Sequence, residues 1–386
     1  MTPFVFDTTR SLVFRRGAAA DLARHAGTVL GKSCFVITDP GLRQLGLCDA
    51  AIASLEEAGH AVSVFDSVEA DPSRATLMTA VDAARAAGAT GIVGFGGGSS
   101  MDVAKLVALL LGSGEPLDEA WGVGQAKGPR LPLVLVPTTA GTGSEVTPVS
   151  IITIGEEEKR GVSSPVILPD IAILDPDLTL SLPAAVTAAT GVDAMVHAIE
   201  AYASSNANNN PLSRMLAREA LRLLGANIET AVFEGGNADA RAAMLLGSML
   251  AGQAFANSPV AAVHALAYPI GSTFHVPHGL SNALVLPHVL GFNAPEAAHL
   301  YAEIAADAFP RLAEVEGAQA RCAAFIEALH GLSAKLGLQT RLREVSVPEE
   351  ALAKMASDAM LQTRLLVNNP REVTEADALA IYRAAW

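Results

Sequence analysis

The 386-residue sequence contains few cysteines, few basic residues and no long hydrophobic run. The three cysteines, Cys34, Cys48 and Cys322, are odd in number and lack metal-type spacing, so we expect free thiols in a reducing cytosol and no disulfide framework. Lys and Arg total 26 against 40 Asp and Glu, which gives a formal net charge of −14. Nucleic acids and anionic membrane surfaces select basic patches, so neither is an expected partner.

We also expect neither a secretory signal peptide nor a membrane-spanning segment. The first ten residues lack the basic start and apolar run of a secretory signal peptide. The most apolar stretch, Val103 to Leu111, contains Lys105 and is shorter than the ~20 residues that span a bilayer. We therefore expect a cytoplasmic protein.

The chain does contain enough apolar sequence for about two domains, each with its own core. Apolar residues make up 51% of the sequence and charged residues 17%, a balance typical of globular rather than disordered proteins. Up to about Leu180, short apolar runs alternate with amphipathic stretches, which favours a mostly parallel α/β sheet. The expected strands are residues 35–38, 61–65, 91–95, 133–136 and 171–174.

The character of the sequence changes after Leu182 and Pro183. From there it is rich in Ala, Leu, Glu and Arg, with helical periodicity and few β-branched runs. The expected helices are residues 77–87 and 101–111 in the first part and 213–224, 238–255 and 318–336 in the second. We predict an α/β domain at 1–180 and an all-helical domain at 181–386.

Four polar residues in the second domain are candidates for a metal site. Asp193 and His197 are four residues apart in a helical pattern, so both side chains lie on one helix face. His264 and His278 follow later in the chain. One carboxylate and three imidazoles suit a borderline divalent transition ion. The alternative is that they are surface polar residues and core histidines. The apolar flanking residues favour the metal, because a charged group there needs a partner.

Two glycine-containing loops in the first domain are candidates for binding a cofactor. Residues 94–102 (GFGGGSSMD) follow an expected strand and open a helix, so backbone N–H groups can approach a phosphate closely. The pattern is neither G-x-G-x-x-G nor a Walker A loop, so an ordinary turn is the alternative. Residues 137–145 (PTTAGTGSE) also follow a strand, and their small hydrogen-bond donors favour a binding role.

Asp39 stands just past the first expected strand. An acidic residue there can accept hydrogen bonds from the ribose hydroxyls of a dinucleotide and repel a 2′-phosphate. A turn residue before Pro40 is the alternative interpretation. With cofactor motifs in one domain and metal-type residues in the other, we expect the site in a cleft between them.

Together these motifs resemble the iron-containing (group III) alcohol dehydrogenase family. The resemblance rests on residues 96–102, 137–147, 189–202 and 274–283, in that order, and extends over nearly the whole chain. It implies a Rossmann-like dinucleotide-binding domain and an all-helical metal domain, an architecture shared with dehydroquinate synthases. It implies NAD as cofactor, and Fe²⁺, with Zn²⁺ as the alternative. The implied metal ligands are Asp193, His197, His264 and His278.

The resemblance also implies roles for residues of the first domain. It places Gly97, Gly98 and Ser99 at the pyrophosphate, Thr138, Thr139, Thr147 and Lys159 further along the cofactor, and Leu178 at the adenosine end, and it matches Asp39 to a position associated with NAD over NADP. Lys159 also fits a solvated residue in the charged run of residues 156–160. The segment from Phe4 to Phe14 resembles a hairpin that family members exchange, so a homodimer or larger homo-oligomer is implied.

The implied reaction is reversible hydride transfer between NAD(H) and a small alcohol, aldehyde or ketone. Tyr268 stands where many family members have a histidine offered as a proton relay. A phenol with an unperturbed pKa near ~10 relays less readily at neutral pH, so Tyr268 either moves the proton or shapes the pocket. Phe255 resembles a position that narrows the substrate pocket, with a core aromatic as the alternative. His275 is expected to line the pocket or the surface and not to bind metal.

Three competing functions stay open. A dehydroquinate synthase-like lyase acts on a sugar phosphate and needs cationic side chains, yet residues 192–202 and 262–286 contain no Lys or Arg. A metal-independent, maleylacetate reductase-like enzyme is disfavoured because those relatives generally replace the aspartate ligand, whereas this chain keeps Asp193. A non-catalytic metal- or nucleotide-binding scaffold is the third, because motifs do not demonstrate turnover.

Overall fold

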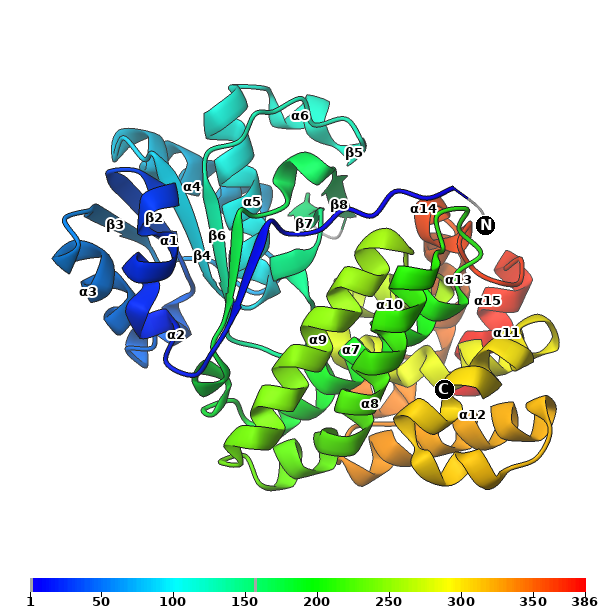
Figure 1. The fold of residues 1–386 in the computed structure, drawn as a ribbon. Helices are drawn as coiled ribbons and strands as arrows, with labels where there is room; N and C mark the ends of the chain where they lie inside the picture. The colour runs from blue at the N-terminus through cyan, green and yellow to red at the C-terminus, as the bar shows by residue number, and fades with distance from the viewer. Residues whose placement is uncertain (1–2, 156–157) are drawn as a thin grey trace. The chain divides into compact units, whose positions relative to one another are not determined.

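The computed structural model describes residues 3–155 and 158–386, and their contacts separate two units. The first unit comprises residues 7–139 and 143–180. The second comprises the described residues before Asp7, residues 140–142 and residues 181–386. In Figure 1 the first unit contains the sheet, in blue to green, and the second contains the helices that run from green to red.

A parallel sheet forms the centre of the first unit. Its strands are β1 (Ser11–Phe14), β2 (Ser33–Ile37), β3 (Ala61–Phe65), β4 (Gly91–Gly96), β6 (Leu133–Pro137) and β9 (Ile171–Leu174). Within the described residues they form one six-stranded sheet in the order β1-β9-β6-β4-β2-β3, and each neighbouring pair is parallel. The predicted fold class is confirmed, and each of the five predicted strands overlaps one of these.

Helices cover both faces of this sheet. They are α1 (Leu22–Leu30), α2 (Pro40–Gln44), α3 (Asp49–Glu57), α4 (Arg74–Ala86), α5 (Gly98–Ser113) and α6 (Leu117–Ala120), with short 3-10 helices η1 (Ala19–Asp21), η2 (Ser144–Val146), η3 (Pro165–Ile167) and η4 (Pro176–Thr179). Successive strand residues face opposite sides. Phe35 and Ile37 therefore pack with residues of α4 and α5, while Cys34 and Val36 pack with residues of α1 and α3.

A second, smaller sheet in this unit was not predicted. It contains β5 (Gly122–Val123), β7 (Val149–Ile154) and β8 (Glu158–Ser163) in the order β5-β8-β7. The β-branched run of β7 is a strand signal in the sequence, whereas the charged start of β8 is not. Residues 156 and 157, at the start of the charged run that contains Lys159, lie outside the described residues.

The prediction of a hairpin from Phe4 to Phe14 is wrong. Residues 3–10 form no strand, and β1 pairs in parallel with β9, with Ser11 opposite Ile171. A hairpin requires two antiparallel strands joined by a tight turn. Within one chain, β1 instead finds its hydrogen-bond partner about 160 residues later at the edge of the parallel sheet. Exchange of this segment between protomers stays a prediction.

The second unit is helical, as predicted. Its helices are α7 (Ala184–Ala203), α8 (Pro211–Phe233), α9 (Ala238–Asn257), α10 (Ala262–Phe274), α11 (His278–Ala308), α12 (Ala318–Lys335), α13 (Leu352–Ala359), α14 (Thr363–Leu366) and α15 (Glu375–Ala385), with η5 (Pro310–Glu314), η6 (Leu342–Val345) and η7 (Glu349–Ala351). Helix α7 packs against α8, α9 and α11. Across the described residues, none of the helices has the length and apolarity to cross a membrane.

Burial of α7 matters for the site. Every residue from Gly191 to Ala203 is buried, because a helix that is apolar all round packs on every side. Asp193, His197 and Glu200 are polar exceptions within this stretch. Polar groups buried in apolar surroundings need partners, so these three side chains are candidates for a functional site.

Candidate active site

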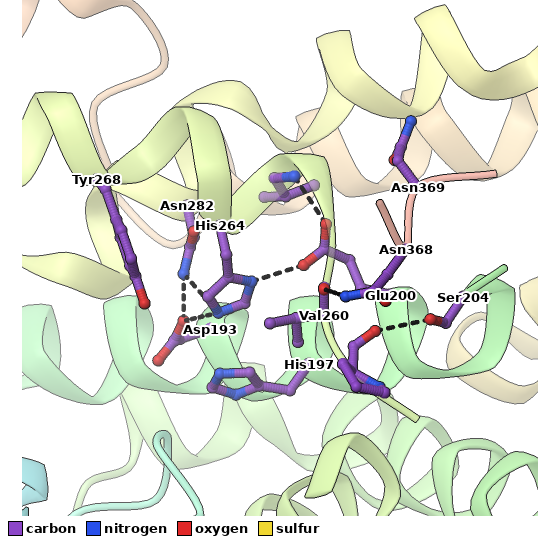
Figure 2. A network of polar contacts seen from close by, with 12 residues as sticks. Asp193, His197, Glu200, Ser204, Val260, His264, Tyr268, Asn282, Asn368 and Asn369 are labelled. Carbon is purple, nitrogen blue, oxygen red and sulfur yellow. Dashed lines mark hydrogen bonds and ion pairs between the residues drawn. The ribbon is translucent and has the colours of Figure 1, made fainter. Parts of the chain in front are cut away.

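Three helices bring the four metal-type residues together. Helix α7 carries Asp193 and His197, α10 carries His264, and His278 is the first residue of α11. One ligand atom from each residue lies within 4.8 Å of the others. Asp193 Oδ1 is 4.0 Å from His264 Nε2 and 3.8 Å from His278 Nε2. Figure 2 shows Asp193, His197 and His264 converging on one point.

The protonation states of the buried members suit metal binding. Burial lowers the pKa of His197 to about 3, although the charge of Asp193 opposes the shift, so the imidazole stays neutral with a lone pair. Burial alone would raise the pKa of Asp193, but the neighbouring imidazoles and the Asn282 amide outweigh it and lower that pKa. Metal ligands bind as ionised carboxylate and neutral imidazole, which are the states favoured here.

The arrangement fits a divalent transition ion. With bonds of about 2.0–2.1 Å, ligand atoms around one ion lie roughly 3–4 Å apart, so the Asp193–His separations need little closure. Asn282 Nδ2 lies 3.3 Å from the Nε2 atoms of both His264 and His278 and 2.6 Å from Asp193 Oδ1. The partly positive N–H group of Asn282 therefore lies where lone pairs of Asp193, His264 and His278 converge. This position favours a positive charge, such as that of a metal ion. The donor set is borderline in softness and suits Fe²⁺ or Zn²⁺.

Glu200, which the sequence interpretation missed, holds one of these histidines. Its Oε2 lies 2.6 Å from His264 Nδ1, and its Oε1 accepts a hydrogen bond from Val263 N at 2.7 Å. The carboxylate is buried and favours a proton on Nδ1, which leaves the Nε2 lone pair for the cluster. Figure 2 shows this contact. A glutamate three residues after His197 in an apolar run was a usable signal.

Asn282 was missed as well. It lies four residues after His278 on α11, so both share a helix face. Its Nδ2 donates to Asp193 Oδ1, and its buried Oδ1 has no partner among the described residues. The amide therefore fixes the rotation of the Asp193 carboxylate. His197 is oriented in a similar way, because its Nδ1 lies 3.2 Å from the Gly141 carbonyl oxygen.

The two predicted catalytic residues lie beside the cluster. The Phe255 ring stacks on His197, with centroids 4.4 Å apart and planes 23° apart. The Tyr268 ring lies 6.0 Å from the His278 ring, centroid to centroid. His275 ends α10 with a φ of 54° and is not a member of the four-residue group. Proton transfer by Tyr268 and narrowing of the pocket by Phe255 stay predictions.

The predicted cofactor residues follow adjacent strands of the parallel sheet. Strands β6, β4 and β2 are neighbours, and their carboxyl ends share one edge. Thr138 and Thr139 follow β6, residues 97–99 follow β4, and Asp39 follows β2. From β2 the chain continues through helices to β3, towards one end of the sheet. From β4 it continues through helices to β6, in the opposite direction, so the strand order reverses between β2 and β4. Open α/β sheets bind ligands at such a switch in strand order.

The glycines allow close packing at this edge. Gly97 is the N-cap of α5 and has no side chain to occupy the N–H groups of the first turn. A Cβ on Gly97 would lie 3.7 Å from Thr139, so the two loops are adjacent. A Cβ on Gly94, inside β4, would lie 2.6 Å from Leu135 and 2.7 Å from Ala104. Only glycine lets α5 approach β4 this closely, which places the helix N-terminus at the sheet edge.

The remaining predicted cofactor residues have other local partners. Asp39 caps α2 by accepting a hydrogen bond from Leu42 N at 3.0 Å, as the turn interpretation expected. Thr147 is buried. Leu178 is buried in η4, just after β9. Lys159 lies on β8 in the smaller sheet and forms an ion pair with Asp71. The sheet edge therefore brings together Asp39, residues 97–99 and the two threonines, but not Lys159.

Both parts of the chain match the models of a known family. Residues 9–176 match the family described as iron-containing alcohol dehydrogenase, and residues 187–386 match the C-terminal part of the Fe-containing alcohol dehydrogenase family. The chain belongs to the iron-containing alcohol dehydrogenase family. Its members and this chain share an oxidoreductase function on alcohols and aldehydes. The family prediction is confirmed.

Individual relatives align over almost the whole chain. It is 42% identical to the long-chain-alcohol dehydrogenase 1 of Geobacillus thermodenitrificans, covering 96% of this chain and 93% of the relative. It is 36% identical to the sulfoacetaldehyde reductase of Bilophila wadsworthia, covering 99% and 98%. Among solved structures, a 1,3-propanediol oxidoreductase matches with a TM-score of 0.95 at 34% identity, covering 100% of both chains.

A buried lysine anchors the loop that follows β6, from Thr138 to Pro148. Lys105 is fully buried in α5, and its Nζ donates to Ser144 Oγ at 2.8 Å and to the Val149 carbonyl oxygen at 2.7 Å. It also donates to Thr147 Oγ1 at 3.3 Å, while Asp102 Oδ1 accepts from Ser144 Oγ at 2.7 Å. The loop after β6 is therefore fastened to the helix that begins at the glycine loop.

Glu145, beside this anchor, predicts an unusual dependence of stability on pH. Burial raises its pKa to about 7 from an ordinary 4.5, and its Oε1 has no partner among the described residues. At this group the folded state therefore binds an extra proton between these values, so the contribution of Glu145 to stability falls as pH rises from about 4.5 to about 7, by on the order of 3 kcal/mol. Glu145→Gln cannot ionise, so its thermal stability relative to wild type should be higher at pH 8 than at pH 5.

The comparison needs a control for loss of one carboxylate. Glu350 is exposed, so Glu350→Gln should change stability little and equally at both pH values. Burial also lowers the pKa of Lys105 to about 8, so its contribution changes with pH only above that value. The lowered pKa of His197 does act between pH 5 and 8, but equally in wild type and variant, so the difference between the two proteins reports Glu145. A stability difference between Glu145→Gln and wild type that is the same at pH 5 and pH 8 would contradict the assignment.

Proposed function

We propose that this enzyme catalyses reversible hydride transfer between NAD(H) and a small alcohol, aldehyde or ketone at a divalent metal ion. The observation that carries the proposal is the approach of four ligand atoms, from Asp193, His197, His264 and His278, to within 4.8 Å of one another. Fe²⁺ is the proposed ion, and the same ligands accept Zn²⁺. Retention of Asp193 favours this over a metal-independent, maleylacetate reductase-like reaction.

Each residue around the cluster has a part in the proposed reaction. A bound ion supplies a Lewis acid for the substrate oxygen. Glu200 keeps the Nε2 lone pair of His264 directed at the cluster, and Asn282 keeps the Asp193 carboxylate in place. Phe255 covers the His197 ring and excludes water from it. Tyr268, beside His278, moves the proton directly or through a water molecule.

The sheet edge of the first unit is the proposed NAD site. The uncapped start of α5 at Gly97, Gly98 and Ser99 suits the pyrophosphate, because backbone N–H groups and the helix dipole favour negative charge. Thr138 and Thr139 offer hydroxyls nearby. A related sulfoacetaldehyde reductase from Bifidobacterium kashiwanohense, 29% identical with a TM-score of 0.87, was solved in complex with NAD⁺.

Three further cofactor residues belong to the proposal. Thr147 and Leu178 are buried in the same unit as this edge. Lys159 would have to exchange its ion pair with Asp71 to bind a phosphate or a ribose. The anchoring of the loop by Lys105 supports Thr147 as part of the cofactor site, because it fixes the backbone there.

Asp39 gives a direct test of cofactor preference. Wild type should prefer NADH, because a carboxylate repels the 2′-phosphate of NADPH. Asp39→Ser keeps a helix cap while removing the charge, so the fold should be retained. We expect the ratio of kcat/KM for NADPH to that for NADH to rise by about tenfold or more, the effect of roughly 1.4 kcal/mol of repulsion. A wild-type preference for NADPH would show that the role given to Asp39 is wrong.

The assembly and the compartment are also proposals. We propose a homodimer or larger homo-oligomer in the cytoplasm. Support comes from the edge position of β1 and from three buried free cysteines, since burial raises the pKa of Cys34 to about 11 and keeps the thiol protonated. Light scattering coupled to size-exclusion chromatography measures the assembly, and a monomer at micromolar concentration would contradict it.

The decisive experiment removes and restores the metal. Protein is stripped with a chelator, reloaded anaerobically with Fe²⁺ or Zn²⁺, and assayed for NADH oxidation with aldehydes and ketones. The panel should span long-chain aldehydes, 3-hydroxypropanal and sulfoacetaldehyde, because relatives are named for such substrates or their alcohols. Activity restored by one ion supports the proposal. Activity indifferent to metal would favour the maleylacetate reductase-like alternative, and NADH binding without turnover would favour a scaffold.

A further inference from the structure

A cationic side chain from a distant part of the sequence contacts Tyr268, which lies beside the metal-type cluster. Arg364 lies on α14, which packs against α10, the helix that carries His264 and Tyr268. Its Nη2 donates a hydrogen bond to the Tyr268 hydroxyl at 3.3 Å. The Tyr268 ring in turn lies 6.0 Å from that of His278, whose side chain is 41% exposed. Arg364 is therefore two contacts away from the accessible member of the cluster.

The backbone of Arg364 is held by a buried side chain. Asn368 is 2% exposed, and its Nδ2 donates to the carbonyl oxygens of both Arg364 and Val260, each at 3.0 Å. Val260 lies just before α10, and Asn206 donates to Asn368 Oδ1 at 2.8 Å. Figure 2 shows the bond between Asn368 and Val260. The turn that carries Arg364 is thereby fixed relative to α10.

The Arg364 side chain is exposed and keeps hydrogen-bond donors in addition to the one that contacts Tyr268. A guanidinium has five N–H donors, and one of those on Arg364 goes to the Tyr268 hydroxyl. In the described parts of the chain, no carboxylate lies within ion-pair distance of Arg364. By contrast, Arg218 and Arg222 of the same unit both pair with Asp307. An arginine with spare donors beside a metal-type cluster favours an anion at that place.

We propose that Arg364 binds an anionic group of the substrate, so that short aldehydes carrying a sulfonate, carboxylate or phosphonate are preferred over neutral ones. This rests on the proposed function, because the carbonyl must react at the cluster while the anion contacts the guanidinium. Residues 192–202 and 262–286, which flank the metal-type residues, contain no Lys or Arg. The cation arrives instead on a helix 96 residues after Tyr268.

The kinetic test compares matched substrates in the metal-loaded enzyme. Succinic semialdehyde and its methyl ester differ mainly in charge, and sulfoacetaldehyde and butanal form a second pair. Wild type should show a higher kcat/KM for the anionic member of at least one pair. Arg364→Met should lower kcat/KM for that member by about 10- to 100-fold, the worth of a charge-assisted hydrogen bond, and change the neutral member by less than about threefold. Arg364→Lys should recover part of the loss.

Salt and a control variant separate a local contact from a general charge effect. Arg383 is an exposed arginine of the same unit, on α15, so Arg383→Met removes one charge elsewhere and should leave the preference unchanged. The preference should weaken as ionic strength rises, because exposed charges are screened. Neutral aldehydes turned over as well as anionic ones, or equal losses for both in Arg364→Met, would overturn the role of Arg364 while leaving the proposed function intact.

A binding measurement keeps the proposal testable without turnover. Calorimetry of 2-hydroxyethanesulfonate and of 1-propanol with metal-loaded protein compares an anionic with a neutral alcohol. Wild type should bind the sulfonate more tightly, and Arg364→Met should weaken its binding by about tenfold or more. Equal affinity of wild type and variant for the sulfonate would overturn the proposal. Failure of the proposed function itself would appear differently, as no turnover of either class of aldehyde.

Discussion

Asp193→Asn should abolish metal retention and lower kcat/KM for aldehyde reduction by roughly 10³-fold or more. A Lewis acid contributes several kcal/mol to such a reaction, and each 1.36 kcal/mol corresponds to about tenfold in rate. The neutral amide is a poor ligand because it lacks the negative charge that the ion requires. The fold should persist, since Asn282 Nδ2 can still donate to the remaining side-chain oxygen.

Metal content by elemental analysis is the main readout, because it does not depend on turnover. Asp358→Asn is the matched control. Asp358 forms an exposed ion pair with Lys354 on α13, so this variant should keep its metal and its activity. Unchanged metal content and turnover in Asp193→Asn would contradict the ligand assignment. Lost metal with unchanged turnover would instead favour the maleylacetate reductase-like alternative.

Glu200→Gln should weaken metal binding by about 10- to 100-fold without removing any ligand, as loss of a partner that orients a ligating histidine does elsewhere. The Glu200 carboxylate serves two neighbours at once, Val263 N and His264 Nδ1. An amide has one acceptor oxygen, so one of these contacts must be lost. A buried donor left unpaired costs about 1–3 kcal/mol, so the free energy of unfolding should also fall.

The metal dissociation constant, measured by competition with a chelator, separates positioning from general stability. Glu303→Gln is the control, because Glu303 accepts a hydrogen bond from the Tyr202 hydroxyl in the same unit and is not a member of the cluster. It should leave metal affinity unchanged and change stability little, because Glu303 is exposed and the amide oxygen can still accept this hydrogen bond. If Glu200→Gln loses stability but binds metal as tightly as wild type, Glu200 has only a structural role.

Local patterns in the sequence were sufficient for five of the six strands of the parallel sheet and for the helical character of the second unit. The strands β2, β3, β4, β6 and β9 are short apolar runs that end at glycine, proline or aspartate, so periodicity and punctuation marked them within a few residues. Burial of β2, β4, β6 and β9 on both faces made those runs continuous, whereas β3 is a half-buried edge strand. The strands β1 and β8 were missed because one lies at an exposed edge and the other begins with charged residues. The partner of β1 is β9, about 160 residues later, whereas β8 pairs with the neighbouring strand β7.

The candidate site, like the fold, was predictable from the sequence only in part. Asp193, His197, His264 and His278 stand in long motifs, so the residue types and their order were visible before any fold, although metal binding stays a proposal. The contacts that support them were not visible. Glu200 meets His264 across 64 residues, and Asn282 meets Asp193 across 89. No local signal specifies which of many buried polar groups will be neighbours.

By itself, the sequence determined the fold class, the family and the residue types available for chemistry, because helical and strand periodicity and motif order are properties of the linear chain. Only the tertiary structure decided the partners of those residues. In the sequence, Lys105 indicated only that its apolar stretch does not span a membrane. In the structure, its hydrogen bonds to Ser144 and Val149 hold the loop after β6. The tertiary structure also brought Arg364 to Tyr268. Such contacts depend on how separate helices and strands pack, and packing is set by the whole chain at once.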